Sequence, residues 1–324
     1  MAIDMDRMWS EVHRKKNVVG RSGTLHKKIR NGKEVRALAF RVYVEEKAPL
    51  SSLSSEDVIP PVIDGVPTDV IAVGKMTALP LKKNTPDEDP KLYRRPTPAG
   101  VSAIYAGGSA CTAGWFARDL TDDTTVIIAN NHCCAQENTL PVGHPYVQPS
   151  PHDGDPITLG HLKRFVEIKY IEFTCAFRNT LFRLFKKFFI KEECNNLVDL
   201  GIVSVEEADI KREILNIGKL RGKRRGTIGE EMEKMGRTTG HTSGGTLIDN
   251  SYIGTVQYSR GMALFGPVGL IQKDGFSAGG DSSSAIVTSS DKNFAGLLFA
   301  GSNTHTIFCH YDDVERQGNV EIIW

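Results

Sequence analysis

A serine, a histidine and an aspartate in this 324-residue chain have neighbours that suit acyl-transfer chemistry. Ser282 follows the glycine-rich stretch 275–281, and the strand-like apolar run 285–287 comes after it. A serine hydroxyl becomes a useful nucleophile only when a base takes its proton during attack on a carbonyl carbon. Glycines let backbone N–H groups turn toward one point, where they can receive the oxygen of that carbonyl. Because Gly-Asp-Ser is a common tripeptide, its meaning depends on a histidine and an aspartate elsewhere.

The candidate partners of Ser282 are His132 and Asp199. His132 comes just after the apolar run 126–129, so a strand would carry it to the edge of a sheet. Asp199 lies inside the apolar run 197–205, where burying a carboxylate is costly unless a specific partner receives it. Taken singly, they read as an exposed histidine, a strand-end aspartate and a serine in a turn. Taken together, they favour a nucleophile, its base and the group that orients the base.

Short β-strands are the elements that would position these residues. Downstream of Gly100, apolar runs of strand length alternate with glycine-rich turns, which is typical of an all-β sandwich or barrel. The expected strands are 101–106, 124–129, 197–205, 246–248, 253–258, 263–265, 285–288 and 294–299. A basic, phenylalanine-rich insertion around 162–194 departs from this pattern, and its part 178–191 has helical spacing. That helix either packs on its own domain or docks on an anionic membrane or a partner protein.

The N-terminal region, residues 1–80, has a different organisation. A helix is expected over 3–16, and the Asn31-Gly32 turn between apolar runs predicts a β-hairpin. A third strand is expected at 68–73, so the region reads as a small α+β domain with a regulatory, docking or pro-region role. Residues 81–98 are rich in proline and charge and are expected to form a linker.

Composition places the chain among ordinary globular proteins, with 40% hydrophobic residues, 24% charged residues and a formal net charge of +1. This balance gives no reason to expect nucleic acid as a partner, and no apolar run is long enough to cross a bilayer. The first nine residues contain acids and lack the apolar core of a secretory signal. We therefore expect a cytoplasmic protein, with its six cysteines reduced rather than bridged.

From about residue 100 to its end, the chain resembles a chymotrypsin-fold (trypsin-like) serine protease. It is more similar to the bacterial α-lytic group than to the digestive enzymes. The motifs that carry this resemblance are Asn130-Asn131-His132-Cys133, Leu197-Val198-Asp199-Leu200-Gly201-Ile202, Gly236-Arg237-Thr238-Thr239-Gly240, Gly280-Asp281-Ser282 and Gly296-Leu297-Leu298-Phe299-Ala300-Gly301. The Gly-Arg-Thr-Thr-Gly motif is the most telling, because bacterial members carry the same five residues. The order of His132, Asp199 and Ser282 is also the order in these proteases.

This resemblance implies a fold and a set of catalytic roles. The fold would be an all-β two-barrel chymotrypsin-like protease domain over 99–324, preceded by the small N-terminal α+β domain. Ser282 would be the nucleophile, His132 its base, and Asp199 the group that holds the imidazole. The backbone N–H groups of Gly280 and Ser282 would form the oxyanion hole.

The resemblance also implies a supporting ion pair and a substrate pocket. Arg237 would pair with Asp281 beneath the nucleophile loop, since a buried carboxylate without a partner is costly. The pocket would be lined by Phe276, Phe299, Ala300 and Gly301. Phenylalanine at its floor argues against a preference for lysine or arginine and favours a shallow pocket for small or apolar side chains.

The cysteines near His132 admit more than one interpretation. Cys111 and Cys133 match positions that are bridged in the family, and they are either bonded or reduced. A metal cluster at His132-Cys133-Cys134 conflicts with the usual two-to-four-residue spacing of zinc ligands. We predict no metal and no cofactor.

One residue of the nucleophile loop departs from the family pattern, because Ser283, followed by Ser284, stands directly after the nucleophile where glycine is usual. A side chain at 283 can alter the loop or crowd the leaving group. We predict a serine endopeptidase that hydrolyses protein or peptide substrates through an acyl-enzyme. The alternatives are a catalytically inactive protease-fold binding or scaffold module, and a regulator that associates with membranes through 178–191.

Overall fold

The computed structural model describes residues 3–30, 33–76, 89–171 and 195–324. The Asn31-Gly32 turn, the first part of the expected linker and the stretch 178–191 lie outside these described residues. The expected membrane or partner surface on 178–191 therefore stays a prediction. Within the described residues, no helix is both long enough and apolar enough to cross a membrane.

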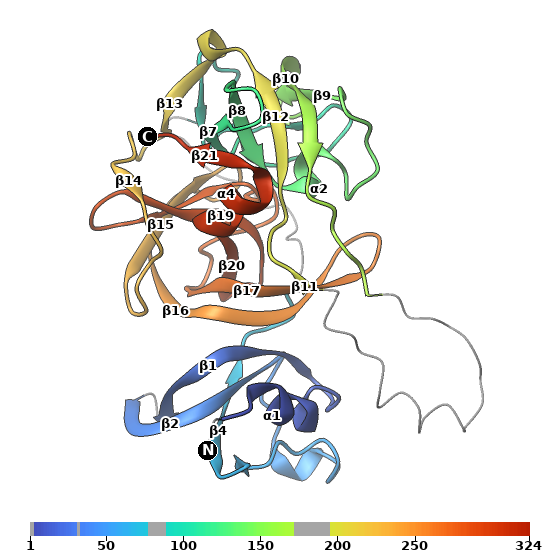
Figure 1. Cartoon of the computed structure of the whole chain (residues 1–324), viewed down its shortest axis with the longest axis vertical. Helices are drawn as coiled ribbons and strands as arrows, with labels where there is room; N and C mark the ends of the chain where they lie inside the picture. Colours follow the sequence, from blue (N-terminus) through green and yellow to red (C-terminus); the bar gives the residue numbers. More distant parts are fainter. Residues whose placement is uncertain (1–2, 31–32, 77–88, 172–194) are drawn as a thin grey trace, which may run out of the picture.

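The described chain is mostly β, and most of its strands belong to two large sheets (Figure 1). The seven-stranded sheet contains β6 (Ile104–Tyr105), β7 (Trp115–Asp119), β8 (Thr125–Ala129), β9 (Pro145–Gln148), β10 (Ile157–Phe165), β12 (Gly201–Val205) and β21 (Val320–Ile322). The twelve-stranded sheet contains β1 (Val18–Arg30), β2 (Lys33–Val44), β3 (Val62–Ile63), β4 (Val66–Ala72), β11 (Asn195–Asn196), β14 (Gly222–Lys223), β15 (Glu231–Gly236), β16 (Gly240–Gln257), β17 (Met262–Gln272), β18 (Ala285–Thr288), β19 (Asn293–Gly301) and β20 (His305–His310).

The remaining elements are short. A two-stranded sheet pairs β5 (Thr97–Ala99) with β13 (Ile210–Ile214). The helices and 3-10 turns are α1 (Met5–Val12), α2 (Asn131–Cys134), α4 (Tyr311–Gly318), η1 (Leu50–Ser52) and η4 (Glu207–Asp209).

Alternating burial explains the longest strand, β16. From Thr246 to Gln257 most buried residues alternate with partly exposed ones, as expected where one face of a strand packs on a core. The two strands expected at 246–248 and 253–258 are therefore one strand, because β17 pairs with β16 on both sides of the polar interruption at 249–252. The pairing shifts register within that interruption, which marks a β-bulge rather than a turn.

The N-terminal helix and strands join the larger sheet. Met8 and Val12 of α1 are buried against Phe40 and Val42 of β2. The helix is shorter than the expected 3–16, because it ends at Val12. Asn17 then adopts a left-handed backbone (φ 74°) at the turn into β1. β1 pairs antiparallel with β2 and also with β16, so one continuous sheet links the two regions (Figure 1).

Residues 89–98 do not behave as the linker that their composition predicts. Pro90 O accepts from the N–H of Ser102 at 2.8 Å, and Gln148 Oε1 accepts from the N–H of Arg94 at 3.0 Å. Thr97–Ala99 forms β5, and Pro90 is buried. Proline lacks only the N–H donor, so the carbonyl groups of this segment can still accept hydrogen bonds. The segment is therefore packed against the rest of the chain.

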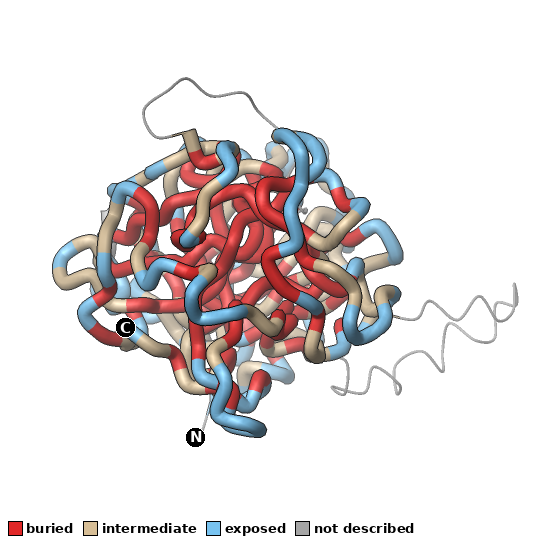
Figure 2. Tube along the Cα trace, turned by 90° about the horizontal axis from the view of Figure 1, so that it is seen from above, coloured by how far each residue is buried: buried red, intermediate tan, exposed pale blue. Residues whose placement is uncertain are grey.

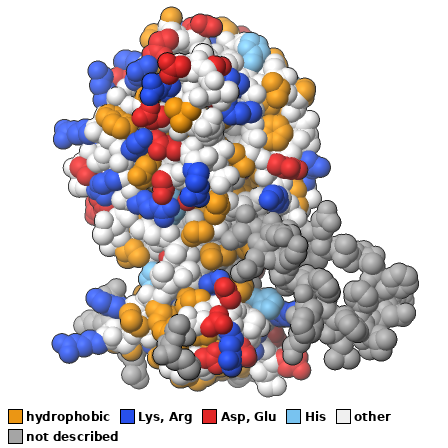
Figure 3. All heavy atoms as spheres, viewed as in Figure 1, with side chains coloured by type: hydrophobic (Ala, Val, Ile, Leu, Met, Phe, Trp, Pro, Cys, Tyr) orange, Lys and Arg blue, Asp and Glu red, His pale blue; other side chains and the backbone are white. Residues whose placement is uncertain are grey.

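The core connects the two sheets. Its largest buried cluster includes Trp115 and Phe116 of β7 as well as Tyr252 and Phe265 of β16 and β17. Figure 2 shows the buried residues gathered at the centre, with the exposed ones around them. Basic and acidic side chains are interspersed over the face shown in Figure 3.

Candidate active site

His132 and Asp199 form a direct hydrogen bond. Nδ1 of His132 lies 2.5 Å from Oδ2 of Asp199, and Oδ1 accepts from the backbone N–H of His132 at 3.3 Å. α2 carries the histidine just after β8, and the aspartate comes just before β12. Because β8 and β12 are antiparallel neighbours, with Ala129 opposite Gly201, the end of one strand meets the start of the other. The carboxylate therefore occupies Nδ1 and leaves Nε2 as the nitrogen that can exchange a proton with a nucleophile.

The electrostatic setting strengthens the basicity of His132. Burial by itself would lower the pKa of the imidazole, because a dry site disfavours its charged form. The charge of Asp199, the hydrogen bond to it and the charge of Glu137 act in the other direction. The pKa of His132 consequently lies above its ordinary value.

Asp199 is fully buried, and several groups fix it in place. Its carbonyl oxygen accepts from Asn130 Nδ2 at 2.8 Å, and its N–H donates to Cys309 Sγ at 3.4 Å. Its Oδ2 also accepts from the hydroxyl of Tyr258 at 2.8 Å. The sequence analysis did not identify Tyr258. Its only signal was that a buried tyrosine hydroxyl usually needs a partner.

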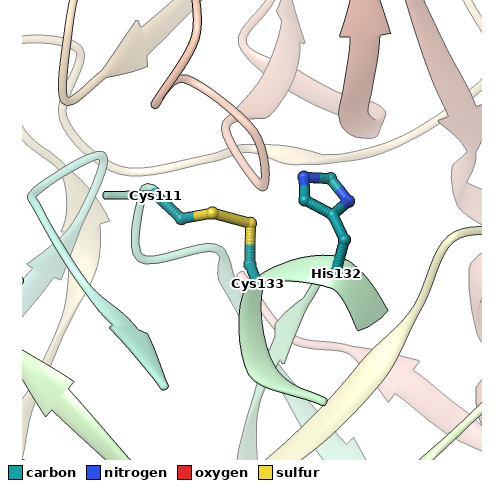
Figure 4. A group of neighbouring side chains, drawn as sticks. All are labelled: Cys111, His132 and Cys133. Carbon is teal, nitrogen blue, oxygen red and sulfur yellow. A yellow bond between two sulfur atoms is a disulfide. The ribbon is translucent and has the colours of Figure 1, made fainter. Parts of the chain in front are cut away.

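Ser282 belongs to a loop that is bonded to the surroundings of His132. Its carbonyl accepts from the N–H of Thr112 at 3.0 Å, and the hydroxyl of Thr112 donates to the carbonyl of Gly280 at 2.7 Å. Thr112 follows Cys111, which is bridged to Cys133 next to His132 (Figure 4). The structure thus places the serine loop and the histidine at one corner between the two sheets. In the part of the chain that is described, Ser282 Oγ makes no hydrogen bond, including to His132.

Two backbone N–H groups of this loop are available as donors. The N–H groups of Asp281, Ser283 and Ser284 donate to carbonyl groups at 2.8–3.0 Å. Within the described residues, those of Gly280 and Ser282 have no partner. Gly280 has a φ of 95°, which an L side chain rarely adopts. The two residues expected to form an oxyanion hole therefore have unoccupied N–H donors among the described residues.

Ser283 adopts a backbone conformation that favours glycine. Its φ is 75°, in the left-handed region, and its side chain is buried. Its hydroxyl accepts from the N–H of Asn130 at 2.8 Å and faces Asn130 Oδ1 at 3.3 Å. The side chain points into the protein, so it ties the nucleophile loop to the histidine segment.

The expected ion pair between Arg237 and Asp281 is wrong. Asp281 pairs instead with Lys234, whose Nζ lies 3.1 Å from Oδ2, and both side chains are fully buried. Residues two apart on a strand share a face, and a side-chain carbon on Gly236 would lie 2.5 Å from Asp281 Oδ1. Lys234 and Gly236 therefore face Asp281, while Arg237 points the other way. Burial lowers the pKa of Lys234, although the charge of Asp281 opposes that shift.

Asp281 is also one of the best-satisfied carboxylates in the described chain. It accepts four further hydrogen bonds at 2.6–3.1 Å, from the N–H groups of Ala278, Thr238 and Thr239 and the hydroxyl of Thr239. Three of those donors come from the Gly-Arg-Thr-Thr-Gly motif. The motif does support Asp281, through its two threonines rather than its arginine.

Arg237 has a different partner, Asp153, which the sequence analysis did not identify. Its Nε donates to Asp153 Oδ2 at 2.7 Å, its Nη2 bonds to Oδ1, and both side chains are almost completely buried. Arg237 directly follows β15 and Asp153 lies between β9 and β10, so this pair links the two sheets. Burial acts to raise the pKa of Asp153, but the Arg237 guanidinium and two serine hydroxyls hold it below its usual value.

The two cysteines beside His132 form a disulfide, with their Cα atoms 6.0 Å apart. Cys111, His132 and Cys133 have their ligand atoms within 4.8 Å of one another, but the two sulfur atoms are bonded together (Figure 4). This arrangement is a bridge beside a histidine, not a pair of thiolate ligands. The expectation that the cysteines are reduced is wrong for this pair, while Cys134 and Cys309 are buried and free. A cytoplasmic location stays a prediction, and the disulfide weighs against it.

The expected pocket residues are buried, but Phe276 belongs to a different hydrophobic cluster from Phe299 and Ala300. Phe276 packs in a cluster with Ile271, Leu298 and Phe308. The rings of Phe299 and Phe265 lie 4.7 Å apart, and Ala300 and Gly301 follow on β19. Rings therefore occupy the volume beneath this strand. Whether that surface binds substrate stays a prediction.

Solved structures that are similar to this chain are those of proteases, at low sequence identity. No protein-family model and no curated sequence matches the chain. Thermobifida fusca protease A has 16% identity and a TM-score of 0.45, with 69% of this chain and 97% of that chain covered. Nocardiopsis protease has 17% identity and a TM-score of 0.46, with coverage of 69% and 98%. A glutamic-acid-specific serine protease has 18% identity and a TM-score of 0.44, with coverage of 70% and 100%. The structural matches are to bacterial chymotrypsin-fold serine proteases of the α-lytic-like group, at low sequence identity.

Proposed function

We propose that this chain is a serine endopeptidase of the two-barrel, chymotrypsin-like kind. The observation that carries the proposal is the 2.5 Å bond between His132 Nδ1 and Asp199 Oδ2. This bond leaves Nε2 of His132 free to take the proton of Ser282. The Ser282 loop lies at the same corner between the two sheets as His132. The two unoccupied backbone donors at Gly280 and Ser282 support the same chemistry.

The reaction needs no group beyond these residues and water. Ser282 Oγ attacks the scissile carbonyl carbon while its proton passes to His132 Nε2. Asp199 stabilises the imidazolium that results, and the N–H groups of Gly280 and Ser282 receive the negative oxygen. Nε2 then protonates the leaving amine, which departs and leaves an acyl-enzyme. Water attacks the acyl carbonyl with His132 again as the base, and Ser282 regains its proton when the acid leaves.

We also propose that the N-terminal elements form a small α+β domain. β1 pairs with β16, and the hydroxyl of Ser302, just after β19, donates to the carbonyl of Val73 at 2.7 Å. The domain is thus attached beside the strand that we expect to bind substrate. Its role would be regulatory or partner-docking, and intact mass after incubation tests the pro-region alternative, which requires cleavage between residues 80 and 100.

Active-site labelling tests the proposed function. The loop has three consecutive serines, so they provide matched controls for one another. We expect a fluorophosphonate to label the full-length protein once, on the peptide that contains Ser282. Labelling should disappear in Ser282→Ala and persist in Ser284→Ala. Absence of labelling in folded protein would contradict the proposal.

A catalytically inactive binding or scaffold module is the second candidate. The observation that favours it is that no hydrogen bond joins Ser282 Oγ to His132 among the described residues. Catalytic hydrogen bonds are often long or misaligned without substrate, so this observation weighs less than the His132–Asp199 geometry. A folded protein that binds peptides but is neither labelled nor able to cleave a peptide library would support this candidate.

A further inference from the structure

The carboxylate that orients His132 has a second strong donor, the hydroxyl of Tyr258. Oδ2 of Asp199 accepts from His132 Nδ1 at 2.5 Å and from Tyr258 Oη at 2.8 Å. Asp199 is fully buried, and a carboxylate taken out of water is stable only where donors replace its hydration. Tyr258 lies just beyond the end of β16. It comes 59 residues after Asp199 and 126 residues after His132 (258 − 132) in the chain, so only the fold brings it to this site.

The ring of Tyr258 is held so that its hydroxyl has one direction. It packs edge-on against the imidazole of His132, with centroids 5.8 Å apart and planes at 64°. On its other sides are Tyr170, at 6.3 Å, and Phe265, at 5.9 Å. The side chain is almost completely buried. A rotation that moved the hydroxyl away from Asp199 would therefore displace three rings.

The turn that follows Tyr258 is tied to the segment that carries His132. Glu137, three residues after α2, accepts from the N–H and the hydroxyl of Ser259 at 3.1 and 2.9 Å. It also accepts from the N–H of Arg260 at 3.0 Å, and Arg260 Nη1 donates to its carbonyl at 2.8 Å. This clamp fixes the turn between β16 and β17 against the histidine segment. It thereby keeps the hydroxyl of Tyr258 and the carboxylate of Asp199, which come from different sheets, in fixed positions relative to each other.

The hydroxyl remains a donor at all working pH values. Burial, followed by the charge of Asp199, raises the pKa of Tyr258 well above its usual value, so the phenol stays protonated. An ionised phenol could not donate to a carboxylate.

We propose that Tyr258 is a positioning residue for the general base, acting through Asp199. This inference rests on the proposed function. The hydroxyl holds Oδ2 on the line to His132 Nδ1 and takes up part of its negative charge. Without it, the carboxylate would pull harder on the imidazolium proton and would be less well fixed. The base would then be more basic but less often in the geometry that accepts a proton from Ser282.

The test compares Tyr258→Phe with Tyr170→Phe in the full-length protein. Both variants remove one hydroxyl from touching rings, but the hydroxyl of Tyr170 faces Glu137 Oε2 at 3.3 Å rather than Asp199. In Tyr258→Phe we expect kcat to fall about 10- to 100-fold with KM unchanged, as for the loss of a hydrogen bond to a charged group. We also expect the acid midpoint of kcat/KM to move to higher pH. Tyr170→Phe should keep both the rate and the midpoint.

A second variant retains the hydroxyl in case Tyr258→Phe does not fold. 3-Fluorotyrosine at position 258 keeps the ring and strengthens the donor, so the acid midpoint should move to lower pH. An unmoved midpoint in both position-258 variants overturns the inference, and so does an equal loss of rate in Tyr258→Phe and Tyr170→Phe. Fluorophosphonate labelling of the unmodified protein distinguishes failure of the proposed function from failure of the proposed role of Tyr258. If the unmodified protein is not labelled, the proposed function fails; if it is labelled, only the role of Tyr258 is being judged.

Discussion

Two buried aspartates in this molecule have nearly the same neighbours, and only one is arranged for proton transfer. Asp199 accepts from Tyr258 and His132. Asp249, in β16, accepts from the hydroxyl of Tyr43 and has Nε2 of His26 3.5 Å from its Oδ1. A serine is present at each place, because Ser22 Oγ lies 2.7 Å from that same His26 nitrogen. By residue type alone, the molecule contains two sets of serine, histidine and aspartate.

The difference between the two sets is which ring nitrogen each group uses. At Asp199 the carboxylate occupies Nδ1 and leaves Nε2 for a nucleophile. At Asp249 both the serine and the carboxylate face Nε2 of His26, so the ring cannot be oriented through one nitrogen while it works through the other. Ser22 is also fully buried in β1, opposite Tyr252 of β16. The Asp249 set is therefore a polar junction between the N-terminal strands and the larger sheet.

Replacing each histidine with alanine should produce the largest difference in kcat between the two sets. His132→Ala removes the proposed base, and kcat should fall about 10⁶-fold, as for loss of the catalytic histidine in subtilisin. His26→Ala should leave kcat unchanged and lower the melting temperature, because it removes a partner of Ser22 and Asp249. Cleavage of a peptide substrate and thermal unfolding measure the two outcomes. Loss of activity in folded His26→Ala would mean that the Asp249 set takes part in catalysis.

Replacing each aspartate with asparagine separates orientation from stability. Asp199→Asn cannot hold the same tautomer of His132, so kcat should fall about 10⁴-fold. Asp249→Asn should retain activity but lower the free energy of unfolding by about 1–3 kcal/mol, since its donors lose a charged acceptor. These donors are the hydroxyl of Tyr43 and the N–H and hydroxyl of Ser251. Urea denaturation and steady-state kinetics on both variants measure these effects. An equal fall in kcat in the two variants would contradict the proposed difference between Asp199 and Asp249.

Asp281 extends the comparison to an aspartate whose main partner is a cation. Lys234→Met leaves its charge buried without that partner, so the free energy of unfolding should fall by about 3–5 kcal/mol and labelling of Ser282 should be lost. Lys292→Met is the matched control, because Lys292 is one-third exposed where it pairs with Glu233. Its loss should cost less than the loss of Lys234, because His241 Nε2 still lies 2.9 Å from Glu233 Oε2. Equal destabilisation in the two variants would show that the Lys234–Asp281 pair has no special role.

How much of this the sequence predicts depends on the range of the interactions. β18 has the predicted bounds, 285–288, because a local apolar run determines it. The sequence indicates His132, Asp199 and Ser282 as candidates because each has a recognisable local motif. The partner of Asp281 was predicted wrongly, since the choice between Lys234 and Arg237 depends on which face of β15 each residue occupies. The end of β15 cannot be located closely enough from apolar spacing, as five consecutive residues there are buried.

Long-range pairings were beyond the sequence patterns. β1 and β16 pair although Gly20 and Gly254 are far apart in the chain, and no local signal indicates this register. The same applies to the hydroxyl of Tyr258 on Asp199 and to Asp153 on Arg237. The two side-chain contacts unite segments of different sheets, so they exist only after the strands have been placed. A buried polar residue shows that a partner is needed without showing which one.

The two aspartate centres should also differ in their response to pH. Activity requires neutral His132, whose pKa is raised, so the acid limb of kcat/KM should have a midpoint above about 6.5. The stability contributed by that raised pKa is present below the unfolded value and is lost as pH rises through the folded one. Burial acts to raise the pKa of Asp249, but His26, Tyr43 and Ser251 hold it below its usual value. Its contribution to stability is therefore present above about pH 4 and is lost as pH falls through the folded pKa.

The pH experiment separates the two centres on one protein. Activity should decline as pH falls through the pKa of His132, a range in which the free energy of unfolding does not fall, and stability should fall only in more acid solution. Asp249→Asn should flatten the acid slope of the unfolding free energy without moving the activity limb. If one midpoint governed both properties, the two centres would not be independent.

The smallest expected effect separates two adjacent tyrosines at the Asp249 junction. The rings of Tyr43 and Tyr252 lie 5.1 Å apart and both are fully buried. The hydroxyl of Tyr43 donates to Asp249, whereas that of Tyr252 has no hydrogen-bond partner among the described residues. Tyr43→Phe should therefore lower the free energy of unfolding by about 1.5–3 kcal/mol, the value for a hydrogen bond to a charged group. Tyr252→Phe removes an unsatisfied polar group and should leave the stability unchanged or raise it slightly. Urea midpoints measure both changes in stability. Neither variant should change kcat, because the Asp249 junction does not leave a histidine nitrogen available for proton transfer. Equal destabilisation would mean that ring packing, rather than the bond to Asp249, determines what these hydroxyls contribute.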